Sequence, residues 1–334
     1  MSSDGAGVAH ECDILIIGAG PAGLYAAYYA GFRGWSVVVM DALPEAGGQI
    51  TAMYPEKDIF DIAGFPAVKG RVLVEQLLAA AEPFHPTYVL GEQAVGLTTS
   101  ADSPAVVTGA AGTTIVAKAV IITGGIGSFT PRALPADDGW AGRGLVYFVP
   151  RLADHADRDI VIVGGGDSAF DWAYTLQPIA RSVALVHRRE QFRAHGSMVD
   201  TVRDLGVRLF TSSEVSAIRG NGTIREVEVT HKTSGEVTVL PAQTVVAALG
   251  FVANIGPIAQ WGVELTKRHI TVDTAMRTNL PRVFAAGDIV TYEGKVPLIS
   301  VGFGEAALAV NNAAPIVEPG MGIFPGHSSG GSAE

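Results

Sequence analysis

Cysteine is almost absent from this chain, whose 334 residues include only Cys12. One cysteine cannot form an intrachain disulfide or a Cys-x-x-Cys redox pair, and it cannot make a thiolate metal site. The eight histidines show no metal-ligand spacing. We therefore expect no metal site and no dithiol exchange within the chain. Cys12 is interpreted as a small apolar residue beside a strand, and an intermolecular redox role is the less favoured alternative.

Charge and long apolar runs are also scarce. Charged residues make up 17% of the chain, and no apolar run approaches the length of a membrane span. The first run, Ile14 to Ile17, stops at a glycine and lacks a basic flank, which favours a strand over a signal peptide. We expect a cytoplasmic protein with no membrane partner. The formal charge of −10 argues against nucleic acid as a partner.

Glycine is abundant and stands twice in a nucleotide-binding pattern. Each pattern follows a short β-branched run and leads into a helix-compatible stretch: Gly18-x-Gly20-x-x-Gly23 and Gly164-x-Gly166-x-x-Ala169. Glycine permits the sharp strand-to-helix turn and lets the backbone approach a pyrophosphate, and the helix N-terminus supplies free N–H donors. One such pattern is weak evidence, whereas two with different sequels predict that two dinucleotides bind.

The residues that follow each pattern separate the two ligands. After the first, the next apolar strand ends at Asp41, where a carboxylate accepts hydrogen bonds from a ribose diol and repels a 2′-phosphate. After the second, the matching strand ends in His187-Arg188-Arg189, with Arg193 shortly after. Guanidinium groups bind phosphate well. The first site therefore fits FAD or NAD and the second fits NADP; a solvated surface run is the alternative for the arginines.

Strand and helix signals alternate along the chain, which predicts an α/β fold. We expect two Rossmann-like three-layer dinucleotide-binding domains, one inserted into the other. The boundaries are placed at strand-then-glycine endings: residues 1–122 and 249–334 form one domain, and 123–248 form the inserted one. Residues 330–334 are expected to be a disordered tail. Asp288 follows a third strand ending, where it suits either a flavin ribityl chain or a simple turn, and Gly304-Glu305-Ala306 is expected to open a helix.

Several blocks resemble the thioredoxin-reductase-like ferredoxin–NADP reductases, from about residue 12 to residue 329. The blocks are Gly47-Gly48-Gln49, Tyr54-Pro55-Glu56-Lys57, Ala63-Gly64-Phe65-Pro66, Gly164 to Ala169, His187 to His195 and Ala285-Ala286-Gly287-Asp288. Thioredoxin reductases share the fold but carry a Cys-x-x-Cys before the second pattern. Here that region is Leu145 to Pro150, without sulfur, which favours the ferredoxin-type enzymes.

The resemblance implies roles for individual residues and assigns FAD to the outer domain and NADPH to the inserted one. Asp41, where the family usually has Glu, would bind the adenosine ribose of FAD. Val95 would lie by the adenine, Gln49 and Phe129 on the flavin side, and Asp288 at the ribityl chain. Tyr54 would stack on one face of the isoalloxazine. His327 would cover the other face, in the dimer supplied by the neighbouring subunit, with Ser329 as its hydrogen-bonding neighbour.

The implied activity is electron transfer between NADPH and ferredoxin or flavodoxin, by hydride transfer to flavin N5 followed by one-electron steps. Two alternatives stay open: an NADPH diaphorase that reduces quinones, and a non-catalytic flavin redox sensor. A flavin monooxygenase is disfavoured because no residue cluster suggests a substrate pocket. Docking of an acidic carrier on this acidic chain would need a local basic patch, for which Lys57, Lys69 and Arg71 are candidates, with surface charges as the alternative.

Overall fold

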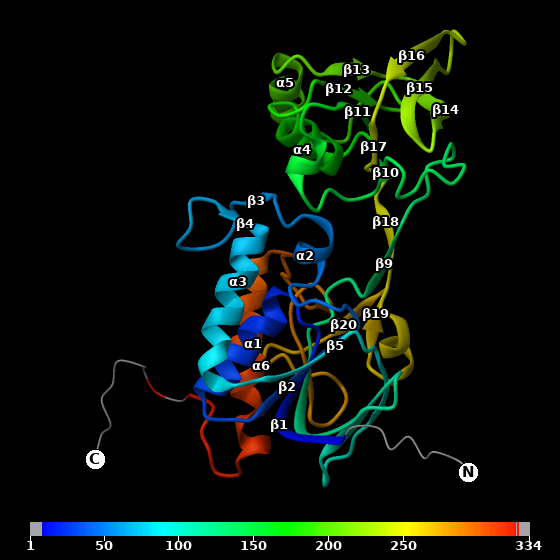
Figure 1. Cartoon of the computed structure of the whole chain (residues 1–334). Coiled ribbons are helices and arrows are strands. Elements are labelled where there is room, and N and C mark those ends of the chain that lie inside the picture. Colours follow the sequence, from blue (N-terminus) through cyan, green and yellow to red (C-terminus); the bar gives the residue numbers. More distant parts are fainter. Residues whose placement is uncertain (1–8, 325, 327–334) are drawn as a thin grey trace, which may run out of the picture. The chain divides into compact units, whose positions relative to one another are not determined.

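The structure is a computed structural model that describes residues 9–324 and residue 326, and its contacts divide the chain into two compact units (Figure 1). The first unit comprises Met1–Ala52, Asp58–Ser128 and Ala253–Glu334, and the second comprises Met53–Lys57 and Phe129–Val252. The chain passes into the second unit along strand β9 (Ser128–Pro131) and returns along β18 (Phe251–Asn254), and these two strands pair with each other.

A seven-stranded sheet forms the centre of the first unit. Its order is β5-β2-β1-β8-β7-β6, with β21 also paired to β8. The parallel strands are β1 (Ala9–Ile17), β2 (Val37–Asp41), β5 (Thr87–Leu90), β8 (Thr114–Ile122) and β21 (Val283–Ala285); β6 (Ala94–Thr98) and β7 (Ala105–Gly109) add an antiparallel edge. The inner parallel strands are apolar runs buried on both faces, as strands covered by layers on either side require.

Helices α3 (Gly70–Ala81) and α6 (Ile299–Val317) pack on either side of α1 (Pro21–Phe32), in cyan, orange-red and blue in Figure 1. Pro21 stands in the first turn of α1, where its missing N–H costs nothing. The smaller elements of this unit are α2 (Gln49–Met53), β3 (Asp58–Ile59), β4 (Val68–Lys69), β19 (Leu265–Thr266), β20 (His269–Thr271), β22 (Val290–Thr291) and the 3₁₀ turns Glu82–Phe84 and Gly256–Gln260.

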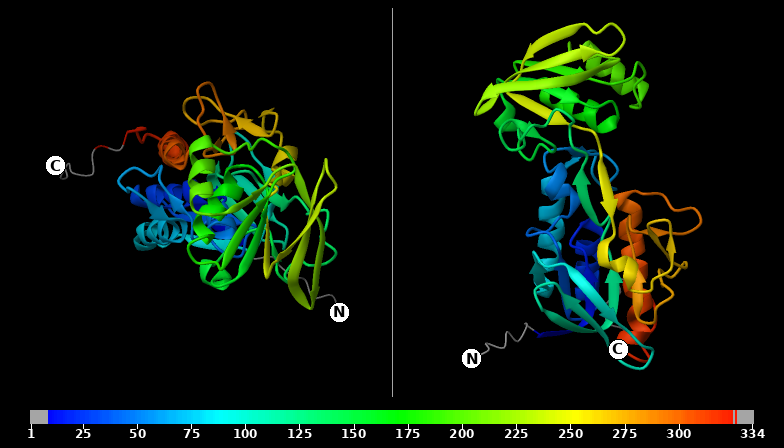
Figure 2. Two further views of the ribbon diagram at one scale, coloured as in Figure 1. Left: turned by 90° about the horizontal axis from the view of Figure 1, so that it is seen from above. Right: turned by 90° about the vertical axis from the view of Figure 1, so that its right-hand side faces the viewer.

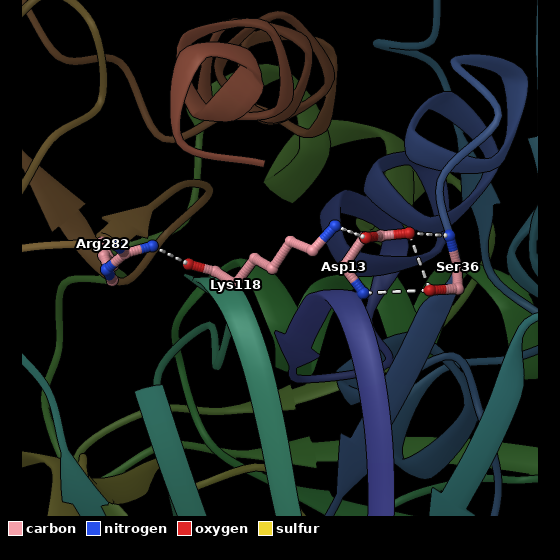
Figure 3. Close-up of polar contacts among 4 residues, drawn as sticks. All are labelled: Asp13, Ser36, Lys118 and Arg282. Atoms are coloured by element: carbon pink, nitrogen blue, oxygen red, sulfur yellow. Dashed lines mark hydrogen bonds and ion pairs between the residues drawn. The ribbon is translucent and has the colours of Figure 1, made fainter. Parts of the chain in front are cut away.

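Asp13, in the middle of β1, joins four segments of this sheet (Figure 3). Its carboxylate accepts hydrogen bonds from the N–H and the hydroxyl of Ser36, both at 2.8 Å, and pairs with Lys118 at 2.7 Å. The guanidinium of Arg282 in turn donates to the carbonyl oxygen of Lys118 at 3.2 Å. Side chains thereby link the middle of β1 and of β8 to the residues directly before β2 and β21, in addition to the backbone ladder.

The second unit has a parallel sheet between two different layers. The sheet has the order β10-β17-β11-β12-β13, with β10 (Leu145–Val146), β11 (Asp159–Val163), β12 (Ser182–Val186), β13 (Arg208–Phe210) and β17 (Thr244–Ala247). Helices α4 (Asp167–Leu176) and α5 (Gly196–Asp204) and the turn Leu152–His155 accompany it. The remaining strands, β14 (Ser213–Asn221), β15 (Thr223–His231) and β16 (Val237–Pro241), form an antiparallel sheet.

Alternation along β11 explains these layers. Val161 and Val163 belong to a core cluster with Val227 of the antiparallel sheet, whereas Ile160 and Ile162 belong to a cluster with the helix residue Phe170. Successive strand residues point to opposite faces, so one apolar run serves both cores. The β14–β16 sheet (yellow-green) and the α4–α5 helices (green) accordingly lie on opposite sides of the parallel strands in the right-hand view of Figure 2.

Among the described residues, no helix combines the length and apolar character that crossing a bilayer requires.

Candidate functional site

The carboxyl ends of four parallel strands meet at one edge of the first unit. Strand β1 leads into Gly18, β2 ends at Asp41, β8 leads into Thr123, and β21 leads into Gly287 and Asp288. Ligands of open α/β sheets bind at this edge, because the strand-to-helix loops converge there. The sheet therefore gathers residues that lie up to 270 positions apart in the sequence (288 − 18 = 270).

The three glycines of the first pattern have different tasks. Gly18 has φ of +116°, and a Cβ there would lie 2.5 Å from the carbonyl oxygen of Thr123. A Cβ on Gly23 would lie 1.8 Å from the oxygen of Gly18, so α1 could not pack against the turn. Gly20 is different: a Cβ there would meet no protein atom within 4 Å. Gly18 and Gly23 are required by the fold, and Gly20 leaves a bare backbone where a pyrophosphate fits.

Asp41 is built into the same turn. Its Oδ2 accepts a hydrogen bond from the N–H of Ala19 at 2.5 Å, and its Oδ1 accepts one from Leu43 at 2.8 Å. Burial raises the pKa of the Asp41 carboxyl, and the two backbone donors oppose that shift. Each carboxylate oxygen keeps a further lone pair, so the side chain is oriented by the backbone and can still accept from a ribose hydroxyl.

Two further predicted segments lie beside this turn. A Cβ on Gly48 would lie 3.0 Å from the Cα of Gly20, and a Cβ on Gly125 would lie 3.1 Å from the side-chain nitrogen of Gln49. The Gly47–Gln49 segment thus packs between the first glycine turn and the end of β8. Gln49 is thereby placed at the sheet edge with the bare backbone of Gly20.

Asp288 also reaches this edge. Its neighbour Gly287 has φ of +84°, and a Cβ there would lie 3.2 Å from the Cβ of Ala22 at the start of α1. The Asp288 side chain is exposed. Desolvation by the surrounding protein raises the pKa of its carboxyl, Lys295 lowers it and Glu305 raises it. Both the expected ribityl ligand and the simple turn residue are compatible with this position.

A buried ionic network that was not predicted from the sequence lies behind this turn. Glu305 accepts hydrogen bonds from the N–H of Gly287 at 2.7 Å, the hydroxyl of Tyr292 at 2.6 Å and the ammonium of Lys295 at 2.5 Å. The side chains of Glu305 and Lys295 are 3% and 9% exposed. A usable signal was present: Glu305 is the single charged residue in the 19 residues of α6. The expected helix start at Gly304 was wrong, because α6 begins five residues earlier, at Ile299.

Thr123 was also missed. Its hydroxyl donates to the carbonyl oxygen of Gly18 at 2.8 Å, and its backbone N–H donates to that of Ile17 at 2.8 Å. These bonds fix the end of β8 against the first glycine turn. The signal was its place at the end of an apolar run, directly before two glycines.

The second unit repeats this construction. A Cβ on Gly164 would lie 2.5 Å from the oxygen of Ala248 and 2.9 Å from the Cβ of Ala169, whereas one on Gly166 would meet nothing within 4 Å. Gly164 and Ala169 again make close contacts, and the backbone of Gly166 between them in the pattern is bare. Ala169 is tolerated where the first unit needs Gly23, since its methyl group packs against the Gly164 backbone. These residues fit a second pyrophosphate.

His187 has a structural position in this second turn. It is buried, and one ring nitrogen lies 3.1 Å from the carbonyl oxygen of Gln191. Burial lowers its pKa, the Gln191 contact opposes this, and Arg188 and Arg189 lower the pKa further. The ring is therefore neutral at pH 7, so His187 supports the turn and adds no positive charge to a phosphate site.

The arginines are held beside the second turn by the backbone. The N–H of Arg193 donates to the oxygen of Gly165 at 2.7 Å, and the N–H of His195 donates to a carboxylate oxygen of Asp167 at 3.2 Å. The side chains of Arg188, Arg189 and Arg193 are exposed, and within residues 9–324 none of the three pairs with a carboxylate. Their guanidinium groups are available to an anionic ligand.

The remaining predicted residues have these positions. Val95 is 40% exposed, and its carbonyl oxygen accepts a hydrogen bond from Trp261 at 3.2 Å. Phe129 packs edge-on against Phe148 and tilted against Phe251, with ring centroids 6.0 Å apart in both pairs. Tyr54 belongs to the second unit and packs against the core cluster that contains Phe170. His327 and Ser329 lie outside the described residues.

Lys57 and Lys69, which were considered for carrier docking, have carboxylate partners. Lys57 pairs with Asp171 at 2.5 Å within the second unit, and Lys69 pairs with Asp58 at 3.1 Å within the first. Both pairs neutralise positive charge locally. These two lysines therefore contribute less positive charge to a basic patch than two unpaired lysines would.

Comparison with known proteins identifies the family. The model of the pyridine nucleotide-disulphide oxidoreductases matches residues 12–312. The chain belongs to this family. It is 61% identical to a ferredoxin–NADP reductase of a Nocardioides species over 96% of this chain and 98% of that protein, and 59% identical to one of Frankia alni over 96% and 99%.

Among solved structures, thioredoxin reductase of T. acidophilum has a TM-score of 0.75 at 24% identity, covering 91% of this chain and 97% of that one. This likeness shows the fold, so the predicted α/β architecture of two Rossmann-like domains is confirmed, as is the predicted family. The family name refers to disulphide substrates, but with Cys12 alone this chain lacks the paired thiols of intrachain dithiol chemistry.

Proposed function

We infer that this protein is an FAD-dependent ferredoxin–NADP reductase, which transfers electrons between NADPH and ferredoxin. The observation that carries this function is the duplicated cradle: two glycine turns with a bare middle residue, one beside Asp41 and the other beside exposed arginines. The relatives that bear this enzyme name are about 60% identical over nearly the whole chain, which supports the same pair of cofactors.

The first unit is proposed to bind FAD and the second NADPH, which is the assignment expected for residues 1–122 with 249–334 and for 123–248. At the first site, Gly20 faces the pyrophosphate and Asp41 the adenosine ribose. Gln49 and Asp288 lie on the flavin side and Val95 near the adenine. At the second site, Gly166 faces the pyrophosphate. Arg188, Arg189 and Arg193 recognise the 2′-phosphate, and His187 shapes their loop.

FAD, when bound, accepts a hydride from the nicotinamide and releases electrons singly to the carrier. The chain needs no general acid for this chemistry; its residues bind the two dinucleotides, orient them and exclude water. Tyr54, Phe129 and His327 are proposed to line the flavin, with Ser329 beside His327. The arrangement of these side chains around the flavin is likewise proposed.

An absorbance spectrum and two titrations test this function. The purified protein is expected to be yellow, to be bleached by NADPH without oxygen, and to respond to NADH only at much higher concentration. Turnover with a purified ferredoxin is then compared with turnover on a quinone. Fast ferredoxin reduction supports the reductase, quinone turnover alone supports a diaphorase, and bleaching without turnover on any acceptor supports a redox sensor. A colourless protein that FAD cannot reconstitute would reject all three.

Flavodoxin is proposed as a second carrier, tested in the same turnover assay with a purified flavodoxin. A cytoplasmic location stays a prediction from the sequence.

A homodimer is also part of the proposal, supported by the surface of the first unit. Helix α1 contains no charged residue, and the single one in α6 is the buried Glu305. Phe32 and Leu308 of these helices are each 44% exposed. An uncharged apolar helix pair is unusual on a free surface and suits a second copy of the chain. Sedimentation velocity is expected to show a dimer that Leu308→Glu dissociates, and a monomeric wild type would reject it.

A further inference from the structure

The buried Glu305–Lys295 pair is not explained by stability alone. Removing two charges from water is costly, and replacing such a pair by apolar residues is often neutral or stabilising. By contrast, in the pair of Arg181 and Asp159 the arginine side chain is 57% exposed, so much less is desolvated. The Glu305–Lys295 pair thus carries a large desolvation cost, and it lies directly behind the sheet edge proposed for FAD.

Every polar contact of Glu305 holds the segment that carries Asp288. One carboxylate oxygen accepts from the N–H of Gly287, the residue before Asp288. The other accepts from Tyr292 and Lys295, which lie in the loop after it. Both ends of the Gly287–Lys295 segment are therefore tied to the second turn of α6.

Two further contacts, besides those of Glu305, hold the Gly287–Asp288 turn. The N–H of Ala286 donates to the oxygen of Ile122 at 3.0 Å, which fixes the turn to β8. Gly287 lies against Ala22 at the start of α1. The N–H of Gly287 donates to Glu305. Without that acceptor, the Ala286–Gly287 peptide, which directly precedes Asp288, would lose its side-chain contact.

The two charges also act on Asp288 in opposite directions. Lys295 lowers the pKa of that carboxyl and Glu305 raises it, so both lie within electrostatic range of it. A ligand group held by Asp288 would therefore be subject to the field of both charges.

We propose that Glu305 and Lys295 are positioning residues for the flavin: Glu305 sets the Gly287–Asp288 turn, and the mutual compensation of the two charges sets the local electrostatic potential. This rests on the proposed placement of Asp288. Neither residue needs to touch the cofactor. The pair acts by orienting the Gly287–Asp288 turn and through the electric field of its charges. Substitutions can separate these two effects.

Four variants of the holoenzyme separate the two effects. Glu305→Ala removes the acceptor of Gly287 and is expected to raise the Kd for FAD at least tenfold. Glu305→Gln keeps an amide oxygen for that N–H, so FAD binding is expected to be tighter than in Glu305→Ala. Its amide NH2 cannot accept from Lys295, which is left uncompensated and raises the flavin midpoint potential. Lys295→Met leaves Glu305 uncompensated and lowers the potential. The double variant Glu305→Gln with Lys295→Met restores a potential near that of the wild type.

A purely structural role predicts a different pattern, in which the two single variants shift the potential in the same direction or not at all. That pattern overturns the proposal, as does wild-type FAD affinity in Glu305→Ala. If Glu305→Ala does not accumulate as folded protein, the proposal is tested by the direction of the shift in midpoint potential in Glu305→Gln, Lys295→Met and the double variant. The matched control is Asp159→Asn, which breaks the Arg181 pair in the second unit and is expected to leave both FAD affinity and potential unchanged.

Asp288→Asn distinguishes failure of the inference from failure of the site it rests on. If Asp288→Asn binds FAD as tightly as the wild type, the placement of Asp288 at the flavin is wrong. If Asp288→Asn weakens FAD but the Glu305 and Lys295 variants do not follow the signs above, the site stands and the positioning role is wrong.

Discussion

The imidazole ring of His187 lies against the backbone of Gly165, so closely that a Cβ on Gly165 would be 2.2 Å from Nδ1 of the ring. This contact joins the end of β12 to the second glycine turn. It explains why three glycines stand in a row, although the nucleotide-binding pattern requires only the first and third of them. Gly165 is required by the fold, whereas a Cβ on Gly166 would meet no protein atom within 4 Å, and this residue is proposed to face the pyrophosphate.

Replacing these two adjacent glycines by alanine is expected to give opposite results. Gly165→Ala overpacks the contact with His187 and should lower the free energy of unfolding by about 1–3 kcal/mol. Gly166→Ala meets no protein atom, so it should keep the stability and weaken NADPH binding. Thermal unfolding and NADPH titration measure the two effects. A combined Gly165→Ala and His187→Ala variant should show favourable coupling, and simple additivity of the two losses would contradict the contact.

Removing the exposed arginines should change the choice between dinucleotides. The Arg188→Ala and Arg189→Ala double variant is expected to lose roughly 2–4 kcal/mol of NADPH binding, with solvent screening keeping the loss below that of buried pairs. NADH binding should change little, because it has no 2′-phosphate. Titration with both dinucleotides is the measurement, and Arg203→Ala, an exposed arginine on α5, is the control. If the preference for NADPH survives, the 2′-phosphate site lies elsewhere.

Asp13 makes stability depend on pH at the acid end. Desolvation raises the pKa of this carboxyl, but the bonds from Lys118 and Ser36 outweigh it, so the folded pKa is below the usual value. The contribution is therefore complete above the unfolded pKa of about 4 and is lost as the pH falls through the folded pKa.

Asp13→Asn should reduce the free energy of unfolding by about 1 kcal/mol at pH 7, with the difference from wild type shrinking as the pH falls through the lowered folded pKa of Asp13. Denaturant titrations across pH measure this. The exposed Asp102→Asn serves as the control. A difference that stays constant with pH would mean that the carboxylate charge is not what holds the four segments.

Cys12 should be inert in the folded protein. It is 8% exposed, and burial raises the pKa of its thiol to about 12, with Asp13 adding to the shift and a backbone contact from Val38 opposing it. At pH 8 only about one thiol in ten thousand is then ionised, and the thiolate is the reactive form. Alkylation followed by mass spectrometry should show no labelling until the chain is unfolded. Rapid labelling of native protein at pH 8 would reopen an intermolecular redox role.

Local order in the sequence predicted much of the first cradle. Apolar runs that end in glycine specify both the strand and the turn, since no other residue allows the approach of Gly18 to Thr123 or of Gly23 to Gly18. The same reasoning placed Asp41, because the length of one βα unit fixes where the next strand ends. Resemblance added Gln49, whose short segment has no signal of its own that specifies a ligand.

Prediction from the sequence was incomplete where contacts between distant segments determine the structure. The start of α6 was placed too late, because its first turn, Ile299 to Gly302, has no capping side chain and contains β-branched residues. His187 was grouped with the phosphate-binding arginines, but its ring turns inward to Gly165, which only packing determines. The lone charge in α6 marked Glu305, but its partners were not predictable, since its donors come from residues 10 to 18 positions away.

By itself, the sequence determined that this protein has two dinucleotide cradles of different charge and no paired thiols, because backbone turns, strand periodicity and residue counts are local properties. The tertiary structure decided which charges are buried together and which remain exposed. Burial depends on the segments that close over a group, so the same kind of charge is buried behind the Asp288 turn at Lys295 and exposed to solvent at Arg188.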